Sequence, residues 1–341
     1  MIVLWWVDAL VGVLLGALLF TNAIEHIGSR FRVSEGVTAS VFAAIATAMP
    51  EAMVPVIAIF MHSGRQSVRQ QVATGAILGA PLMLATVAFF VMGLAAALAR
   101  GPAAALSPEP SGLRRDLSWF IVSFGIAAFA TLIPERASAI RAAIAAVLVL
   151  LYVLYLVTTI RASAALVASG HGTQLGGPLL ASRLRRFPSG LAGTLIQLGA
   201  GFLLIGFGTH SFLNVVSRLS NRVPPLLLSL LVIPIATELP EKVNSMLWIR
   251  HGRRDTLAFG NISGALVFQG TLLPALGIWL TPWTLHPDVV FSIVLTLSAV
   301  AYLLLMHIRG TLRPYHLVMN GLCYVAYLAL VLHGRGFGSP A

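Results

Sequence analysis

Two stretches of the chain decide its fold: ATAMPEAMVPVIAI at residues 46–59 and ATELPEKVNSMLWI at residues 236–249. Each begins Ala-Thr-x-x-Pro-Glu, and the second begins 190 residues after the first. A glycine-bearing segment follows each of them, GAILGAP at 75–81 and GNISGAL at 260–266, and both read Gly-x-x-x-Gly-Ala. Two matched segments in the same order indicate an internal repeat.

The composition places most of the chain in a lipid bilayer. Of the 341 residues, 58% are hydrophobic and only 10% are charged, whereas a soluble domain carries roughly 25% charged residues. The mean hydropathy is +0.91. The net charge of +11 comes from arginines that lie between apolar runs, which favours a membrane protein over a nucleic-acid-binding one. The lone Cys323 supports neither a disulfide framework nor a thiolate metal site.

The pattern predicts an all-α integral membrane protein with about ten transmembrane helices, each on the order of 20 residues. The repeat offset comprises five spans, and an odd number inverts the second half relative to the first. We therefore expect two inverted five-helix repeats, at residues 1–160 and 189–341, joined by a linker at 161–188. The predicted spans are 7–27, 35–61, 70–99, 117–134, 139–160, 189–216, 224–249, 256–280, 288–307 and 314–333.

The arginines predict the orientation. The loops after odd-numbered spans hold 14 arginines and the opposite loops hold 7, and the arginine-rich side of a membrane protein faces the cytoplasm. We expect a protein of the inner (plasma) membrane, with both termini outside and the central loop in the cytoplasm. The N-terminal sequence does not fit a signal or transit peptide.

Four ionisable residues fall inside the spans that carry the repeat: Glu51, Glu238, Glu241 and Lys242, which is the chain's only lysine. A charge at the bilayer centre costs at least about 2.5–3.5 kcal/mol, and such residues mark ion pathways. Glu51 and Glu241 are therefore the candidate metal ligands. The i, i+4 spacing of Glu238 and Lys242 predicts an ion pair. Alternatively, Glu238 binds the ion and Lys242 takes the place of a second cation.

A proline directly precedes each glutamate of the repeat, and a threonine lies four residues before it on the same helix face. Proline cannot donate to the carbonyl one turn earlier, so that oxygen is freed. Each half offers a carboxylate, a hydroxyl and a carbonyl, which suit Ca²⁺, Na⁺ or a proton. These residues are Thr47, Pro50 and Glu51 in the first half and Thr237, Pro240 and Glu241 in the second.

The glycine segments suit close helix packing, because small residues four apart let helices approach. They comprise Gly75 and Gly79 in the first half and Gly260 and Gly264 in the second. Contact with the ion is the alternative role. Asn261 is polar at this depth, and we expect it to orient a neighbour or to bind the ion.

The Pro-Glu segments resemble the alpha repeats of the calcium/cation antiporter superfamily, which includes the sodium/calcium exchangers. The family pattern is Gly-Ser/Thr-x-x-Pro-Glu, followed by a helix reading Gly-Asn-x-x-Gly-Ser-Asn/Asp, and residues 260–264 match the latter well. The resemblance implies that Glu51 and Glu241 are the central ion ligands, with Thr47 and Thr237 beside them. It also implies alternating access, in which the first two spans of each half slide across the rest.

The chain departs from the family pattern at several helper positions. The amide or carboxylate that ends the glycine motif is Pro81 in the first half and Leu266 in the second, and the first-half asparagine is Ala76. Since Ca²⁺ takes 6–8 oxygen ligands, this reduced set favours coupling to protons over a site for several sodium ions.

The predicted function is secondary active antiport of Ca²⁺ against Na⁺ or H⁺ through a site near the midplane. A monovalent cation/proton antiporter and a non-transporting membrane protein with the same fold remain alternatives. The expected partners are inorganic cations and the lipid bilayer, not nucleic acid, and no cofactor is expected besides the transported ions. We see no P-loop and no Ser/His, Cys/His or paired-Asp arrangement in the spans, so neither an ATP-driven pump nor an enzyme is expected. The sequence does not determine the oligomeric state.

Overall fold

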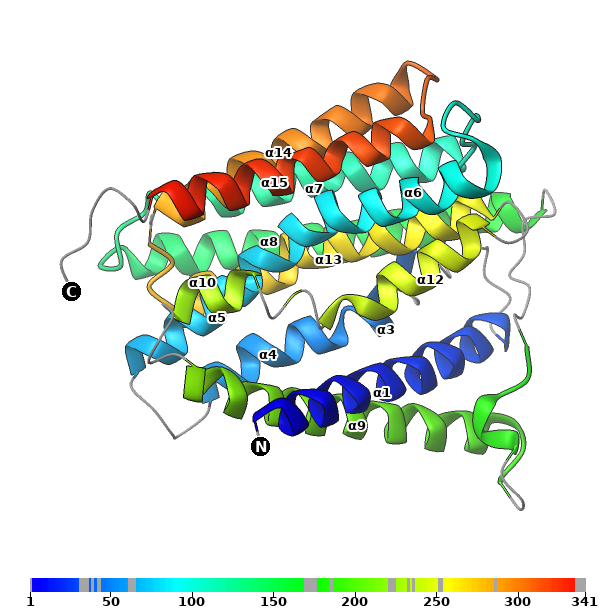
Figure 1. Cartoon of the computed structure of the whole chain (residues 1–341), viewed down its shortest axis with the longest axis horizontal. Helices are drawn as coiled ribbons and strands as arrows, with labels where there is room; N and C mark the ends of the chain where they lie inside the picture. The colour runs from blue at the N-terminus through cyan, green and yellow to red at the C-terminus, as the bar shows by residue number, and fades with distance from the viewer. Residues whose placement is uncertain are drawn as a thin grey trace.

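The computed structural model describes residues 2–30, 37, 40–41, 44–60, 66–168, 177–183, 187–219, 225–231, 234, 237–250, 254–284 and 287–334. This part of the chain is helical and contains no strand, and its long helices lie side by side (Figure 1). The elements are α1 (Ile2–Arg30), α3 (Ala44–Thr47), α4 (Met49–Phe60), α5 (Gln66–Met83), the π-helical turn η2 (Leu84–Ala88), α6 (Phe89–Arg100), α7 (Pro110–Ala130), α8 (Ser138–Ala168), the 3-10 turn η3 (Leu180–Arg183), α9 (Gly190–Leu219), α10 (Pro225–Leu231), α12 (Leu239–Arg250), α13 (Asp255–Leu280), α14 (Pro287–Ile308) and α15 (Pro314–Gly334).

Within the described residues, six helical stretches are long and apolar enough to cross a bilayer. They are 66–100, 138–162, 190–208, 255–280, 287–308 and 314–331. Large apolar side chains on the outside of the molecule, such as Leu98, Leu203 and Trp279, are more than two-thirds exposed, which suits a surface that faces lipid. The all-helical membrane class is thus confirmed, and the count of ten spans stays a prediction.

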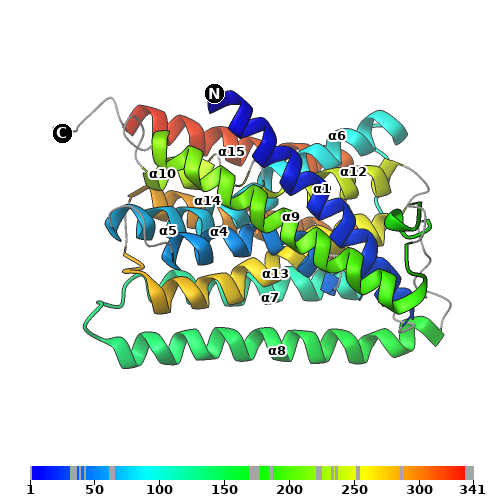
Figure 2. The same cartoon turned by 90° about the horizontal axis from the view of Figure 1, so that it is seen from below.

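Helix α13 lies in the middle of the bundle. It packs against α7 and α8 on one side and contacts α5 and α12, and most of its side chains are buried. Helices α1 and α9 pack along each other and cover one face of the bundle, which both views show (Figures 1 and 2).

The stretches that carry the Pro-Glu segments are not continuous helices. Helix α3 ends at Thr47 and α4 begins at Met49, so Pro50 is the second residue of α4. In the same way Pro240 is the second residue of α12. Proline is tolerated in the first turn of a helix, where its missing N–H has no partner to lose. Each proline therefore begins a new helix within a predicted span.

The predicted fourth span, 117–134, was placed too late in the chain. Helix α7 begins at Pro110 and ends at Ala130. The carboxylate of Glu109 accepts hydrogen bonds from the backbone N–H groups of Ser111 and Gly112, and this N-cap starts the helix. Asp116, which directly precedes the predicted span, therefore lies in the second turn of α7.

Candidate functional site

The two Pro-Glu segments carry four ionisable side chains into the interior. Glu51 lies in the first turn of α4, Glu241 and Lys242 lie in the first turn of α12, and Glu238 directly precedes α12. Glu51 is 2% exposed, Glu238 and Glu241 are fully buried, and Lys242 is 7% exposed. The charges of the other three residues all act on Glu51. Glutamates that lie 190 positions apart in the sequence are therefore within electrostatic reach of each other.

Glu238 and Lys242 form an ion pair inside the molecule. The Lys242 Nζ atom lies 3.3 Å from Glu238 Oε2, and it also donates to the backbone carbonyl of Pro234 at 3.4 Å. The i, i+4 ion pair predicted from the sequence is therefore present. Because the two charges cancel, this pair adds no net charge to the site.

Both carboxylate oxygens of Glu51 are buried, and no described residue donates a hydrogen bond to either. No three carboxylate, imidazole or thiolate groups of the described residues are close enough together to hold a metal ion. An ion bound here would therefore need hydroxyl and backbone carbonyl oxygens to complete its shell.

Asn261 on α13 ties this helix to α12. Its Nδ2 atom donates to the Ser245 hydroxyl at 3.1 Å and to the backbone carbonyl of Glu241 at 3.4 Å. The structure thus places Asn261 beside the backbone of Glu241, and its role in orienting a neighbour or binding the ion stays a prediction. Ser245, which is fully buried, was not expected from the sequence, although it lies one helical turn after Glu241. Thr237 is also buried.

The side chains of Thr47, Pro50 and Pro240 lie outside what the structure describes. The expected roles of Thr47 as an ion ligand and of both prolines in freeing carbonyls therefore stay predictions.

The glycine segments bring backbones into direct contact. A Cβ atom on Gly79 would lie 2.3 Å from the carbonyl oxygen of Leu230, and one on Gly264 would lie 2.1 Å from that of Ser40. On Gly75 it would lie 2.1 Å from the Ser229 hydroxyl. Any larger side chain at these three positions would push α10 away from α5, or Ser40 away from α13. Gly260 is buried in the first turns of α13.

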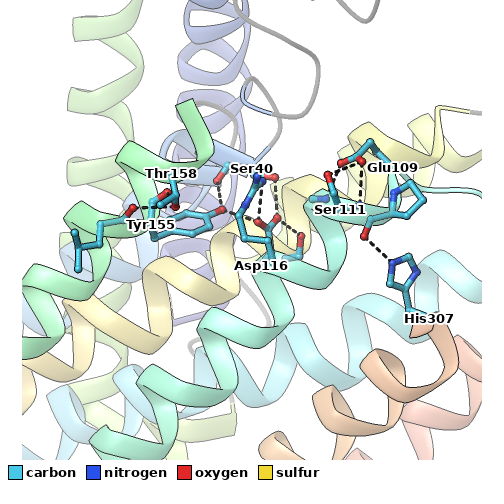
Figure 3. A network of polar contacts seen from close by, with 12 residues as sticks. Ser40, Glu109, Ser111, Asp116, Tyr155, Thr158 and His307 are labelled. Atoms are coloured by element: carbon cyan, nitrogen blue, oxygen red, sulfur yellow. Dashed lines mark hydrogen bonds and ion pairs between the residues drawn. The ribbon is translucent and has the colours of Figure 1, made fainter. Parts of the chain in front are cut away.

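A further buried carboxylate, Asp116, was not expected from the sequence (Figure 3). Its Oδ2 accepts hydrogen bonds from the hydroxyls of Ser40 and Ser263, both at 2.8 Å. Its Oδ1 accepts from the Tyr155 hydroxyl at 3.1 Å and from Arg115 Nη2 at 3.3 Å. The predicted span 117–134 left this residue just outside a helix. Pro110, a typical first helical residue, is the signal that would have placed Asp116 inside the helix.

The start of α7 carries a second, separate set of polar contacts, also drawn in Figure 3. The Glu109 carboxylate caps the helix through Ser111 and Gly112, and His307 Nε2 lies 3.0 Å from the carbonyl oxygen of Pro110. Partial burial acts to raise the pKa of Glu109, but the hydrogen bonds from Ser111 and Gly112 outweigh it, so the pKa lies below its ordinary value of 4.5.

Solved structures share this fold. The H⁺/Ca²⁺ exchanger CAX matches with a TM-score of 0.73 at 15% sequence identity, over 97% of this chain and 82% of that one. A structure of the sodium-calcium exchanger NCX_Mj matches with a TM-score of 0.65 at 16% identity, over 96% of this chain and 97% of that one. At these identities the likeness establishes the fold. No curated protein matches the chain.

The helical fold and the apolar exterior define an integral membrane protein with the architecture of a cation exchanger. The family model described as sodium/calcium exchanger protein matches residues 1–161 and 193–333, so this chain belongs to that family. The assignment to the calcium/cation antiporter superfamily, made from the Pro-Glu segments, is thereby confirmed. Proteins of this family are transporters of inorganic cations rather than enzymes.

Proposed function

We propose that this protein is a secondary active antiporter that exchanges Ca²⁺ for Na⁺ or H⁺ by alternating access through a site formed by Glu51 and Glu241. The observation that carries the proposal is Glu51 itself. Its carboxylate is buried, and neither oxygen has a hydrogen-bond donor among the described residues. An ionised carboxylate in the interior needs a cation, a proton or several donors. A bound cation that alternates with protons or sodium meets this need.

The charge balance suits one divalent ion. Lys242 neutralises Glu238 at 3.3 Å, so Glu51 and Glu241 leave two negative charges for the substrate. One Ca²⁺ or two protons would neutralise them. This arrangement favours Lys242 as a tethered cation that reduces the number of ions the site takes up, with Glu238 as its counter-ion.

The contacts between helices support two inverted repeats at residues 1–160 and 189–341, joined by the linker 161–188. In the two halves α7 corresponds to α14, α8 corresponds to α15, and α13 corresponds to the stretch of α5 and α6. Equivalent helices make equivalent contacts: α7 packs on α13 as α14 packs on α5, and α8 packs on α13 as α15 packs on α6. Similarly, Ser40 lies against Gly264 of α13 as Leu230 of α10 lies against Gly79 of α5. Inverted repeats underlie alternating access in many secondary transporters. With the arginine-rich loops in the cytoplasm, both termini lie outside.

The coupling ion is proposed from the ligands that the site lacks. At the helper positions of the glycine motifs stand Ala76, Pro81 and Leu266, none of which offers a side-chain oxygen. This reduced set favours protons over several sodium ions. It also favours, as a second candidate, a monovalent cation/proton antiporter, since a monovalent ion requires fewer charged ligands. Placing glutamates inside the membrane costs free energy, and a non-transporting protein with this fold would gain nothing in return.

Reconstitution in liposomes tests the proposal. Uptake of radioactive Ca²⁺ is followed against an outward Na⁺ gradient and, in parallel, against an outward H⁺ gradient. Uptake is expected under at least one gradient, and Glu51→Gln and Glu241→Gln are each expected to abolish it. Glu135→Gln is the matched control, because Glu135 is exposed in the turn between α7 and α8, and it should transport as the unmodified protein does.

Absence of Ca²⁺ movement under both gradients, with correctly inserted protein, contradicts the calcium proposal. The same liposomes loaded with Na⁺ or K⁺ against protons then separate the monovalent antiporter from a non-transporting protein.

A further inference from the structure

The polypeptide that leads into α3 is fastened to the helix bundle through Asp116. The four hydrogen bonds to this carboxylate come from Ser40, four residues before α3, and from Arg115, Tyr155 and Ser263 on α7, α8 and α13. An ionised carboxylate has about four acceptor positions, and these donors occupy them. Asp116 therefore has little capacity left for a cation, and its chemistry is that of an anchor.

The backbone of the anchored residue, Ser40, also packs directly against α13. Its backbone rests on Gly264 of α13, where a Cβ atom would lie 2.1 Å from the Ser40 carbonyl oxygen. The Tyr155 hydroxyl approaches that same carbonyl oxygen at 3.4 Å. Gly264 is three residues from Asn261, which contacts Glu241. An opening toward the site from this end would have to lift Ser40 off Gly264 and break its hydrogen bond to Asp116.

Among the described residues, no carboxylate takes part in the equivalent contact of the other half. With the 190-residue offset, Leu230 corresponds to Ser40, and its carbonyl oxygen lies against Gly79 as that of Ser40 lies against Gly264. Leu230 belongs to an apolar cluster with Leu82, Leu227, Tyr327 and Val331. The neighbouring Ser229 donates to the backbone carbonyls of Leu226 at 2.9 Å and of Gln71 on α5 at 3.4 Å, so these acceptors are backbone oxygens. The two halves therefore close with different chemistry at equivalent places.

We propose that Asp116 is a positioning residue that latches a gate on the arginine-rich side of the transporter, and that Ser40 is the movable half of this latch. The equivalent gate on the other side closes by apolar packing around Leu230. This inference rests on the proposed alternating access. It assigns to Asp116 control over access from one side only, and no role in ligating the transported ion.

A small cavity of ≈ 20 Å³ lies beside the latch and provides a reporter position. Asp116, Ser40, Gly260, Glu109 and Thr159 are among the residues that line it. The Thr159 hydroxyl is buried and has no hydrogen-bond partner among the described residues. A cysteine at this position is close to threonine in size and breaks no hydrogen bond of the described structure.

The experiment measures how fast a membrane-impermeant thiol reagent, added from the arginine-rich side, labels Thr159→Cys in a background in which Cys323 is replaced by alanine. Thr159 is 1% exposed in this structure, so slow labelling is expected with the latch intact. Asp116→Asn leaves one acceptor atom for four donors. It should raise the labelling rate at least tenfold, and labelling from the opposite side should stay unchanged.

Two serine variants separate a latch from general loosening of the bundle. Ser40→Ala removes the hydrogen bond from the movable segment and should reproduce the increase, even if Asp116→Asn fails to fold. Ser263→Ala removes a bond between two packed helices, α7 and α13, and should change the rate less. Glu109→Gln is the matched control, because Glu109 lines the same cavity but, among the described residues, its side chain is hydrogen-bonded only to Ser111 and Gly112 at the start of its own helix.

Labelling that is no faster in Asp116→Asn and Ser40→Ala than in Glu109→Gln overturns the proposal, and so does an equal increase in Ser263→Ala. Ca²⁺ flux is measured in the same vesicles. Because labelling needs no transported ion, loss of the proposed antiport activity and loss of the proposed latch give different results.

Discussion

Replacement of Arg141 should destabilise the C-terminal end of α13 more than replacement of any other residue. It lies on α8, is 6% exposed, and has no carboxylate partner among the ion pairs of the described residues. Its guanidinium donates to the Ile278 carbonyl from Nε at 3.2 Å and from Nη2 at 2.7 Å. It also donates to the carbonyls of Thr281 at 2.6 Å and Pro282 at 2.7 Å.

The sequence explains why these carbonyls need an outside donor. Ile278 would receive its helical hydrogen bond from residue 282, which is proline and has no N–H. The carbonyls of Thr281 and Pro282 lie beyond the last residue of α13, Leu280, where no further helical N–H can reach them. A cation at a helix C-terminus is also favoured by the helix dipole.

The magnitude follows from the three carbonyls that Arg141→Met would leave unpaired. Each buried unsatisfied group costs roughly 1–3 kcal/mol, and the lower bound is appropriate near a helix end, so about 3 kcal/mol is expected. An unfolding entropy of about 2.1 cal/mol/K per residue converts this to a melting temperature lower by about 4 °C for the whole chain.

Thermal unfolding in detergent, followed by intrinsic fluorescence, measures this shift. Arg141→Lys keeps the charge but replaces the planar fork with a single nitrogen, so an intermediate shift is expected. Arg136→Met is the control, since Arg136 is exposed. If Arg141→Met melts within 1 °C of Arg136→Met, on the order of the uncertainty of such a comparison, the carbonyl argument is wrong.

Three further outcomes are expected. Gly79→Ala places a Cβ atom 2.3 Å from the Leu230 carbonyl oxygen, so overpacking of about 1–3 kcal/mol should lower the melting temperature, and an unchanged value would contradict the close approach. Arg100→Met leaves Asp255, its partner at 2.7 Å, buried without its cation, and should destabilise by about 3 kcal/mol or more, whereas the double variant with Asp255→Asn should recover part of the loss. The lowered pKa of Glu109 stabilises the fold above the unfolded-state value of about 4.5 and ceases to do so as the pH falls through the lower folded-state value. Melting curves of Glu109→Gln and the unmodified protein should therefore converge as the pH drops below 4.5, and a constant difference across this range would refute the assignment.

Local sequence rules identified the parts of the protein that depend on neighbours in the chain. Hydropathy predicted the helical membrane class, and eight of the ten predicted spans overlap single helical stretches that the structure describes. The repeated Pro-Glu segments predicted the family. Burying a glutamate directly after a proline costs free energy, so the motif is specific enough to identify a family. The Glu238–Lys242 ion pair could also be predicted from the sequence, since i, i+4 spacing on a helix brings two side chains together independently of the rest of the fold.

What the sequence could not supply is contact between distant segments. Asp116 and Ser40 are 76 residues apart, and Asp116 and Ser263 are 147 apart, so no local pattern connects them. The same holds for Arg141 and the end of α13. Helices that are far apart in the chain pack closely, backbone against backbone, as Ser40 packs on Gly264. A buried polar atom in such a contact needs a hydrogen-bond partner, and the packing decides which residue is near enough to be that partner. The sequence alone determined the class of protein and singled out two glutamates that the structure buries, whereas only the tertiary structure determined which side chains hold the helices around those glutamates in place.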